Sequence, residues 1–432
     1  MPLRLTATDP NFELEFSEYV SRRRDVASDV ADVVTQIISG VRTRQDAALL
    51  EYSKKFDRLD LVSGSQLRLT GDEIDKAAGA ARKDAIAALE RASARIETFH
   101  EQQIPEGFDY TDQQGVRLGA RWTPLGAVGI YVPGGTAAYP SSVLMNAIPA
   151  KVAGVERIVM AVPTPEGQIS PLVFAAARMA GVDEIYRIGG AQAIAAFAYG
   201  TETVAPVDKI TGPGNAYVAE AKRQVFGRVG IDMVAGPSEI LVVADSENDP
   251  SWVAADLLSQ AEHDRSSQSV LITDSGALAD AVADAVQKYL SMLPRGDIAQ
   301  ESWERHGAIV LVRDIRDAVP LINRIAPEHL ELALEAPNTL VDRVTNAGAI
   351  FLGRYTPEAI GDYVGGPNHI LPTAGSARFA SGLSTADFMK RTTYVGCDEF
   401  AFDRIGPDAV TLAEAEGMDA HALSLSLRLN RP

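Results

Sequence analysis

Two polar side chains on one helix face are the first candidates for chemistry in this sequence. Gln260 and His263 lie three positions apart, at the end of a helical pattern that begins near Asp249. Residues with this spacing share a face of a helix, so both side chains can point toward one ion. A catalytic metal site combines a few such protein ligands with an open position. Taken alone, the pair also fits two solvated residues at a helix end.

A carboxylate and an imidazole stand side by side in the segment Ala326-Pro327-Glu328-His329-Leu330. Adjacent residues project in different directions in regular structure, so the two groups can serve different steps of a reaction. Histidine can accept or release a proton near neutral pH, and a glutamate can deprotonate a water molecule. An exposed Glu-His pair without a catalytic role is the alternative.

Two further segments supply carboxylates and imidazoles. A glycine-dense loop carries Asp362 and His369, and a segment near the C-terminal end carries Glu416 and His421. Asp362 is a candidate oxygen ligand, or alternatively a cap of its turn. Four of the six histidines thus fall in segments of this kind. That concentration is typical of a metal or acid–base site.

Four glycine-rich turns follow short β-like runs in the middle of the chain. They comprise residues 131–135, 188–192, 211–215 and 235–238. Such turns let a ligand approach the backbone and present helix N-terminal amides to anions. Although α/β proteins need glycine at strand ends in any case, four turns so close together favour a ligand cleft at the carboxyl ends of strands. None matches the dinucleotide pattern GxGxxG, so spacing alone leaves a nucleotide open.

The elements that must position these residues alternate between strands and helices. This alternation predicts an α/β fold with two Rossmann-like parallel-sheet domains and small helical N- and C-terminal extensions. The expected strands are 127–132, 158–162, 184–188, 240–244, 270–273, 308–312 and 349–352.

Domain boundaries follow from changes in pattern. We expect an N-terminal helical arm over 1–25 and a first α/β domain, with the metal and acid–base residues, over 26–125 plus 238–380. Residues 126–237, with the glycine turns, form the second α/β domain. The tail 381–432 should be helical. A segment of that size cannot bury a good core of its own, so it should pack on another surface.

Composition limits the class of protein. Acidic residues outnumber basic ones 58 to 40, for a net charge of −18, which argues against nucleic acid or an anionic membrane as a partner. The single cysteine, Cys397, rules out an intrachain disulfide. No apolar run reaches the ~18 residues of a membrane span. These features predict a soluble cytoplasmic protein.

The motifs together resemble the histidinol dehydrogenase family from about residue 10 to residue 429. The resemblance implies a homodimeric, NAD- and zinc-dependent enzyme. Its reaction would be the oxidation of L-histidinol to L-histidine through L-histidinal with two NAD⁺, in the last steps of histidine biosynthesis. The segments that carry it are RWTPLGAVGIYVPGG, GGAQAIAA, DKITGPGNAYVAEAKRQV, DMVAGPSEIL, LLSQAEHD, APEHLEL, GDYVGGPNHILPT and AEGMDAH.

The resemblance also implies residue roles. Glu328 would activate water, and His329 would act as the acid–base. His369 lies in a motif and lines the site without an assigned role. One zinc ion per subunit would be bound by four residues, the last from the partner subunit: Gln260, His263, Asp362 and His421. The NAD contacts would be Tyr131, Gln192 and Asn215. The substrate would be bound by the zinc ligands and the catalytic pair together with Ser238 and Glu416.

Two other classes of function remain open from the residues. A zinc-dependent hydrolase could use Glu328 as its base without any nucleotide, leaving the glycine turns structural. A non-catalytic binder of small molecules is the other alternative, because α/β clefts bind many ligands.

Overall fold

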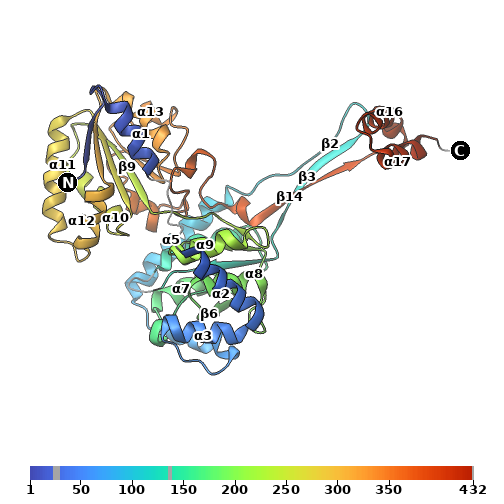
Figure 1. Cartoon of the computed structure of the whole chain (residues 1–432), viewed down its shortest axis with the longest axis horizontal. Helices are drawn as coiled ribbons and strands as arrows, with labels where there is room; N and C mark the ends of the chain where they lie inside the picture. The colour runs from blue at the N-terminus through green and yellow to red at the C-terminus, as the bar shows by residue number, and fades with distance from the viewer. Residues whose placement is uncertain (23–29, 135–138, 431–432) are drawn as a thin grey trace.

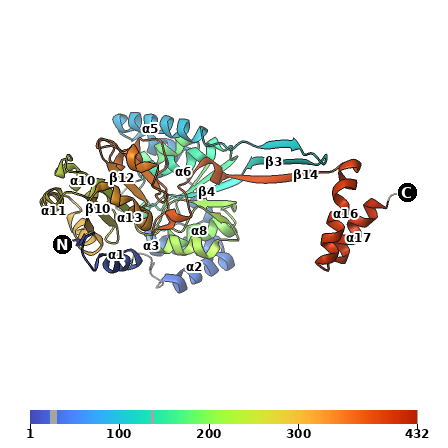
Figure 2. The same ribbon diagram turned by 90° about the horizontal axis from the view of Figure 1, so that it is seen from above.

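The computed structural model describes residues 1–22, 30–134 and 139–430. Two parallel sheets, each covered by helices, form the body, and a long antiparallel ribbon projects from it with two helices at its end (Figures 1 and 2). The predicted α/β class is confirmed. All seven predicted strands are present, with ends that differ from the prediction by at most two residues. Among the described residues, no helix is both long and apolar enough to cross a membrane.

The larger sheet has six parallel strands in the order β1, β11, β10, β9, β12, β13. Strands β9 and β10 are buried along their whole length because helices cover both faces. Helices α1 and α13 cover one face and α10, α11 and α12 the other. The strand bounds are β1 (Leu3–Thr6), β9 (Glu239–Ala244), β10 (Gln268–Thr273), β11 (Ala308–Leu311), β12 (His329–Ala333) and β13 (Ala349–Leu352). The helix bounds are α1 (Phe12–Arg22), α10 (Pro250–Ala261), α11 (Gly276–Leu290), α12 (Gly296–His306) and α13 (Ala318–Ile325), followed by α14 (Asn338–Val341) and α15 (Glu358–Tyr363).

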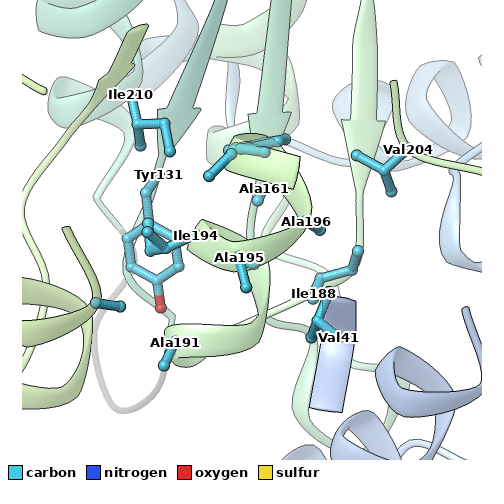
Figure 3. Close-up of a cluster of buried hydrophobic side chains, with 14 of the residues drawn as sticks. Val41, Tyr131, Ala161, Ile188, Ala191, Ile194, Ala195, Ala196, Val204 and Ile210 are labelled. Carbon is cyan, nitrogen blue, oxygen red and sulfur yellow. The ribbon is translucent and has the colours of Figure 1, made fainter. Parts of the chain in front are cut away.

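The smaller sheet has five parallel strands in the order β6, β5, β4, β7, β8. One apolar core lies between this sheet and α8 and α9, and the other between the sheet and α6 and α7. Figure 3 shows part of the first core, with Val41 beside Ile188 and Ile194 of α8 near the ring of Tyr131. The strand bounds are β4 (Ala127–Tyr131), β5 (Arg157–Ala161), β6 (Glu184–Tyr186), β7 (Lys209–Thr211) and β8 (Gly230–Ile231). The helix bounds are α6 (Pro140–Val152), α7 (Pro171–Ala180), α8 (Gly190–Tyr199) and α9 (Ala216–Val225).

The N-terminal quarter of the chain packs differently from the grouping expected from sequence. Strand β1 joins the six-stranded sheet, and Phe16 of α1 is buried against it, so residues 1–22 complete this sheet instead of forming an arm. The next helices bury their apolar faces against the five-stranded half, with Ile37 in one of its cores and Ile96 in the other. They therefore belong with 126–237 and not with 238–380. Their bounds are α2 (Ala31–Arg44), α3 (Asp46–Asp57), α4 (Gly71–Gly79) and α5 (Lys83–Glu101).

The projecting ribbon is a feature that the sequence pattern did not predict. It is an antiparallel sheet in the order β14, β3, β2, in which residues 389–396 pair with 117–124. Largely exposed strands bury few side chains, so they lack the apolar run that marks a core strand. The bounds are β2 (Phe108–Thr111), β3 (Arg117–Pro124) and β14 (Met389–Gly396), followed by the helices α16 (Glu399–Ala415) and α17 (Asp419–Leu429).

Candidate active site

Glu328 and His329 lie at the amino end of β12, where both contact the first residue of the neighbouring strand β9. The Glu239 amide donates a hydrogen bond to Oε2 of Glu328 at 2.8 Å. Nδ1 of His329 lies 2.9 Å from the Glu239 carbonyl oxygen. Both side chains are buried. The backbone of Glu239, at the start of β9, therefore orients both the carboxylate and the imidazole.

The hydrogen bond from Nδ1 sets the chemical state of His329. A carbonyl oxygen can only accept, so Nδ1 carries the proton and Nε2 of the neutral ring keeps its lone pair. Burial lowers the pKa of His329 to about 4, which keeps the ring neutral near pH 7. Nε2 has no hydrogen-bond partner within the described residues. The imidazole is thus prepared to accept a proton from a ligand.

A carboxylate cluster from α15 faces Nε2 of His329. Oε1 of Glu358 is 3.9 Å from Nε2, and Oε2 of the same residue accepts a hydrogen bond from Ser259 at 3.0 Å. Burial, together with the negative charge of Asp362, raises the pKa of Glu358 to about 8. Burial also opposes ionisation of Asp362, but the contact with the adjacent His369, with smaller contributions from neighbouring imidazoles, lowers its pKa to about 2.

The end of α10 supplies the first two predicted metal ligands. Asp249 caps the N-terminus of this helix by accepting the Ser251 amide, and Pro250 occupies its first turn, as the sequence pattern indicated. Gln260 is buried and its Oε1 has no hydrogen-bond partner in the described chain. His263 is exposed just beyond the helix and is close enough to Asp362 for its charge to lower the pKa of that carboxyl.

These residues satisfy the chemistry of a metal site. Ligating atoms of His329, Glu358 and Asp362 all lie within 4.8 Å of one another. This trio shares only Asp362 with the set predicted from sequence. At the end of α10, which packs on α15, are two more residues of types suited to a divalent ion: Gln260, whose amide oxygen has no partner among the described residues, and the exposed His263, whose charge acts on Asp362. The candidate metal site is therefore centred on Asp362, between α10 and α15.

The remaining predicted ligand and one predicted substrate contact do not join this cluster within one chain. Glu416 and His421 are exposed at the junction of α16 and α17, at the far end of the projecting ribbon (Figure 2). Ser238 is half-buried directly before Glu239, so it lies beside the catalytic pair. His369 contacts Asp362, and its Nε2 is 3.4 Å from the Ser142 hydroxyl.

The predicted nucleotide contacts Tyr131 and Gln192 meet at one glycine turn. Tyr131 ends β4, and its hydroxyl accepts a hydrogen bond from the Gly190 amide at 3.0 Å. The buried side chain of Gln192 lies over the same glycine, where a Cβ atom would be 2.8 Å from its Oε1. Gly190 has a φ of +66°, which favours glycine. Of the first predicted turn, Gly135 lies outside the described residues.

The third predicted contact, Asn215, lies at a second turn that a buried ion pair supports. Its Oδ1 accepts the Tyr217 and Val218 amides and caps α9. Beneath the turn, Lys222 pairs with Asp232, and both side chains contact the backbone of Gly212. Nζ of Lys222 donates a hydrogen bond to the Gly212 carbonyl oxygen at 3.0 Å, and the Gly212 amide donates one to Oδ2 of Asp232 at 2.8 Å. The turn with Asn215 follows β7, which is adjacent to β4, and the Gly190 turn follows β6, which is separated from β4 by β5.

Two residues that support the site were not found from sequence. Glu239 acts through its backbone, which no residue-type pattern can reveal. Glu358 stands in a segment without a histidine or a glycine-rich loop, and its only signal is a spacing of four from Asp362 on one helix face. Both were brought to the catalytic pair by tertiary packing.

The fold and site define an α/β protein with a buried Glu328–His329 pair, a candidate metal site and glycine turns suited to a ligand. A profile of the histidinol dehydrogenase family matches residues 20–429. Two relatives named histidinol dehydrogenase, from Rhodospirillum rubrum and Agrobacterium fabrum, are 61% and 59% identical over 432 and 430 residues, covering 100% of this chain and 99% of each relative. The crystal structure of histidinol dehydrogenase from Elizabethkingia anophelis is 38% identical, with a TM-score of 0.93 over 99% of this chain and 98% of that one. The chain therefore belongs to the histidinol dehydrogenase family and is an oxidoreductase.

Proposed function

We propose that this protein oxidises L-histidinol through L-histidinal to L-histidine with two NAD⁺, in the last steps of histidine biosynthesis. The observation that carries the proposal is the buried Glu328–His329 pair, oriented by Glu239, in a chain that matches histidinol dehydrogenases over its whole length. Family membership favours this reaction over a zinc-dependent hydrolysis, which would leave the glycine turns without a role.

The two catalytic residues act in different steps. Nε2 of His329 accepts the hydroxyl proton of the alcohol as the first hydride leaves its carbon. Glu328 then takes a proton from the water that adds to the aldehyde, while the aldehyde oxygen takes the proton held by His329. The resulting hydrate gives its hydride to the second NAD⁺ and a hydroxyl proton to His329, which leaves the carboxylic acid. The two side chains lie close together, with Nδ1 of His329 3.7 Å from Oε2 of Glu328, and their protonation supports this division. Because Nδ1 donates to the Glu239 carbonyl oxygen, Nε2 is the basic atom of the imidazole, and the carboxylate of Glu328 is a second, separate base.

Four residues would hold a zinc ion: Gln260, His263, Asp362 and the partner subunit's His421. Zinc with such ligands supplies a template that orients an imidazole- and amine-bearing substrate. The unpartnered Oε1 of Gln260 and the low pKa of Asp362 support the assignment. Ser238, beside the catalytic pair, and the partner subunit's Glu416 would complete the substrate contacts.

Three residues at the glycine turns would contact NAD: Tyr131, Gln192 and Asn215. The nicotinamide ring supplies the hydride acceptor for both oxidations. Tyr131 and Gln192 converge on Gly190, whose turn begins α8, and helix N-terminal amides suit the pyrophosphate. The Lys222–Asp232 pair supports the second turn from below.

A homodimer with shared active sites would bring the projecting helices into use. Helices α16 and α17 expose large apolar side chains and bury only small ones within the chain. The exposed set is Phe400, Leu412, Met418, Leu423 and Leu427. Such a surface marks a protein interface, and a second subunit would cover it while receiving His421. The reaction and the acidic surface fit a cytoplasmic enzyme.

A single assay tests the reaction. Zinc-loaded protein with limiting histidinol should form two NADH per histidinol, and a chelator should abolish this formation. Hydrolysis of an ester substrate without any NADH formation would instead support the hydrolase, and ligand binding without turnover would support a non-catalytic binder.

Subunit mixing tests the shared site. His263→Ala and His421→Ala change ligands on different parts of the chain, so each homodimer should lose zinc and activity. The mixed dimer contains one site with all four ligands and should recover part of the activity. Absence of recovery, with subunit exchange shown by native mass spectrometry, would contradict sharing.

A further inference from the structure

Helix α3 brings a buried carboxylate to the glycine turn where α8 begins. Asp57, the last residue of α3, is 9% exposed and accepts a hydrogen bond from the Gly189 amide. Its Oδ1 lies 3.5 Å from the point where a Cβ atom on Gly189 would stand. Its charge also reaches Tyr131, whose pKa burial and Asp57 together raise to about 12. Asp57 thus lies within the group of residues expected to contact the nucleotide.

Among the described residues, the Gly189 amide is the one group that stabilises the charge of this carboxylate. Its Oδ2 is buried and has no hydrogen-bond partner in the described residues. Burial raises the pKa of Asp57 to about 6, and the Gly189 amide is the one group that lowers it. A negative charge at the C-terminus of a helix is also disfavoured by the helix dipole. A buried acceptor in this state calls for donors from outside the chain.

The position of Asp57 in the fold indicates what those donors are. In dinucleotide-binding folds, an acidic residue at the end of the strand next to the first one accepts hydrogen bonds from a ribose. Here that strand is β5, beside β4, and it is followed by Val162 and Pro163, neither of which can accept through its side chain. A Cβ atom on Gly189 would touch Pro163 at 2.6 Å, so Asp57 and Pro163 flank the same glycine.

The acid nearest in sequence to the end of β5 is already engaged elsewhere. Glu166 is an exposed residue and pairs with Arg58 at 2.7 Å. Asp57, supplied by a helix some hundred positions earlier in the chain, therefore occupies the place of the ribose acceptor.

We propose that Asp57 accepts hydrogen bonds from the ribose hydroxyls of a dinucleotide bound at the Gly189–Gly190 turn, and that its carboxylate excludes a 2′-phosphate. The proposal rests on the NAD site of the proposed function, and it names the residue that makes this site prefer a ribose hydroxyl to a 2′-phosphate. The carboxylate pairs with a hydroxyl donor, whereas a phosphate at the same place would bring two anions together in a buried site.

Calorimetric titration with ADP-ribose and with 2′-phospho-ADP-ribose tests this directly, since neither probe needs zinc or turnover. Wild-type protein should bind ADP-ribose at least about tenfold more tightly than 2′-phospho-ADP-ribose. It should also bind 2′-deoxy-ADP-ribose more weakly than ADP-ribose. Asp57→Asn should weaken ADP-ribose binding by about 10- to 100-fold, the range for hydrogen bonds to a charged group, and should narrow the ratio between the two probes.

Asp60→Asn is the matched control. Asp60 is exposed three positions further on and pairs with Lys54, so the variant removes the same charge from the same segment and should leave both affinities unchanged. An unchanged ratio in folded Asp57→Asn would overturn the proposal and leave Asp57 a purely structural support of the turn. Equal wild-type affinities for the two probes would overturn it even if Asp57→Asn does not fold.

The same measurements separate this proposal from the proposed function. Selective ADP-ribose binding that depends on Asp57, in a protein that forms no NADH from histidinol, would support the Asp57 assignment and contradict the dehydrogenase. Oxidation of histidinol with NADP⁺ as efficient as with NAD⁺ would support the dehydrogenase and overturn the role of Asp57.

Discussion

The two parallel sheets present their functional residues at opposite ends. On the five-stranded sheet the glycine turns follow the carboxyl ends of β4, β6 and β7. On the six-stranded sheet the acid–base pair lies at the amino ends of β9 and β12, where Glu239 and His329 each begin a strand. The first arrangement follows the general rule that α/β sheets bind ligands at the carboxyl ends of their strands. The second arrangement does not follow this rule.

The difference reflects what each site must hold. A nucleotide can be bound largely by backbone amides, which glycine turns and helix N-termini provide at carboxyl strand ends. Proton transfer instead needs side chains in fixed protonation states. At the amino strand ends, the Glu239 amide and carbonyl group orient Glu328 and His329, and burial keeps His329 neutral. In the proposed function, one half of the protein would therefore act mainly through backbone groups and the other through side chains.

Removing the imidazole should have the largest effect. His329→Asn eliminates the base that accepts the hydroxyl proton, so kcat should fall by about 10²- to 10⁴-fold while zinc content and ADP-ribose affinity stay unchanged. Steady-state NADH formation measures the loss. His306→Asn, on α12, is the control and should retain full activity. A decrease below tenfold in His329→Asn would remove this residue from the proton transfer.

On the nucleotide half, the sharpest perturbation is of the buried ion pair. Lys222→Met leaves Asp232 charged and unpaired beneath Gly212, so the free energy of unfolding should fall by about 3–5 kcal/mol. Urea denaturation measures this change, and ADP-ribose binding should weaken as the turn loosens. Arg223→Met removes an exposed pair with Glu220 and should cost less than about 1 kcal/mol. Equal stability of the two variants would contradict a supporting role for the pair.

Glu328→Gln separates the two oxidations. The variant keeps an acceptor for the Glu239 amide but cannot take a proton from water, so oxidation of histidinal should slow by about 10²-fold. Oxidation of histidinol to histidinal should slow much less. Single-turnover assays started from each substrate compare the steps. Equal losses in both would contradict water activation by Glu328.

The most gradual effect, spread over several pH units, concerns stability near Glu328 and His329. Burial, with the charge of Asp256, raises the pKa of Glu331 on β12 to about 9. The folded state thus keeps a proton that the unfolded chain loses above its ordinary pKa, so wild-type stability falls as pH rises toward 9. Glu331→Gln should remove this pH dependence of the free energy of unfolding. The stability of the variant relative to the wild type should therefore increase with pH, by at most about 1.4 kcal/mol per pH unit.

Urea denaturation of both proteins across this range measures the difference. The exposed Glu335→Gln, on the same segment, should follow the wild type at every pH. A constant gap between Glu331→Gln and the wild type would show that Glu331 changes its protonation equally in the folded and unfolded states.

The predictability of the fold differed among its parts for physical reasons. Buried strands of a parallel sheet are continuous apolar runs, so β9 and β10 could be read directly. The exposed ribbon strands bury little and gave no such pattern. Helices α2 to α5 are clearly amphipathic, but an apolar face does not state which surface it meets, and their grouping was therefore wrong.

The sequence by itself determined the residue types and their local settings: the start of a helix near Asp249, the position of Gln260 at its end, and the glycine turns. These depend on contacts within a few residues. The sequence did not place His263, which lies in the turn beyond α10 and not on a shared helix face. Only the tertiary structure decided that Glu239 orients both Glu328 and His329, that Glu358 faces the imidazole, and that Asp57 reaches the Gly189–Gly190 turn. Such contacts join residues some 30 to 130 positions apart, and it is the packing of the two sheets and their helices that closes these distances.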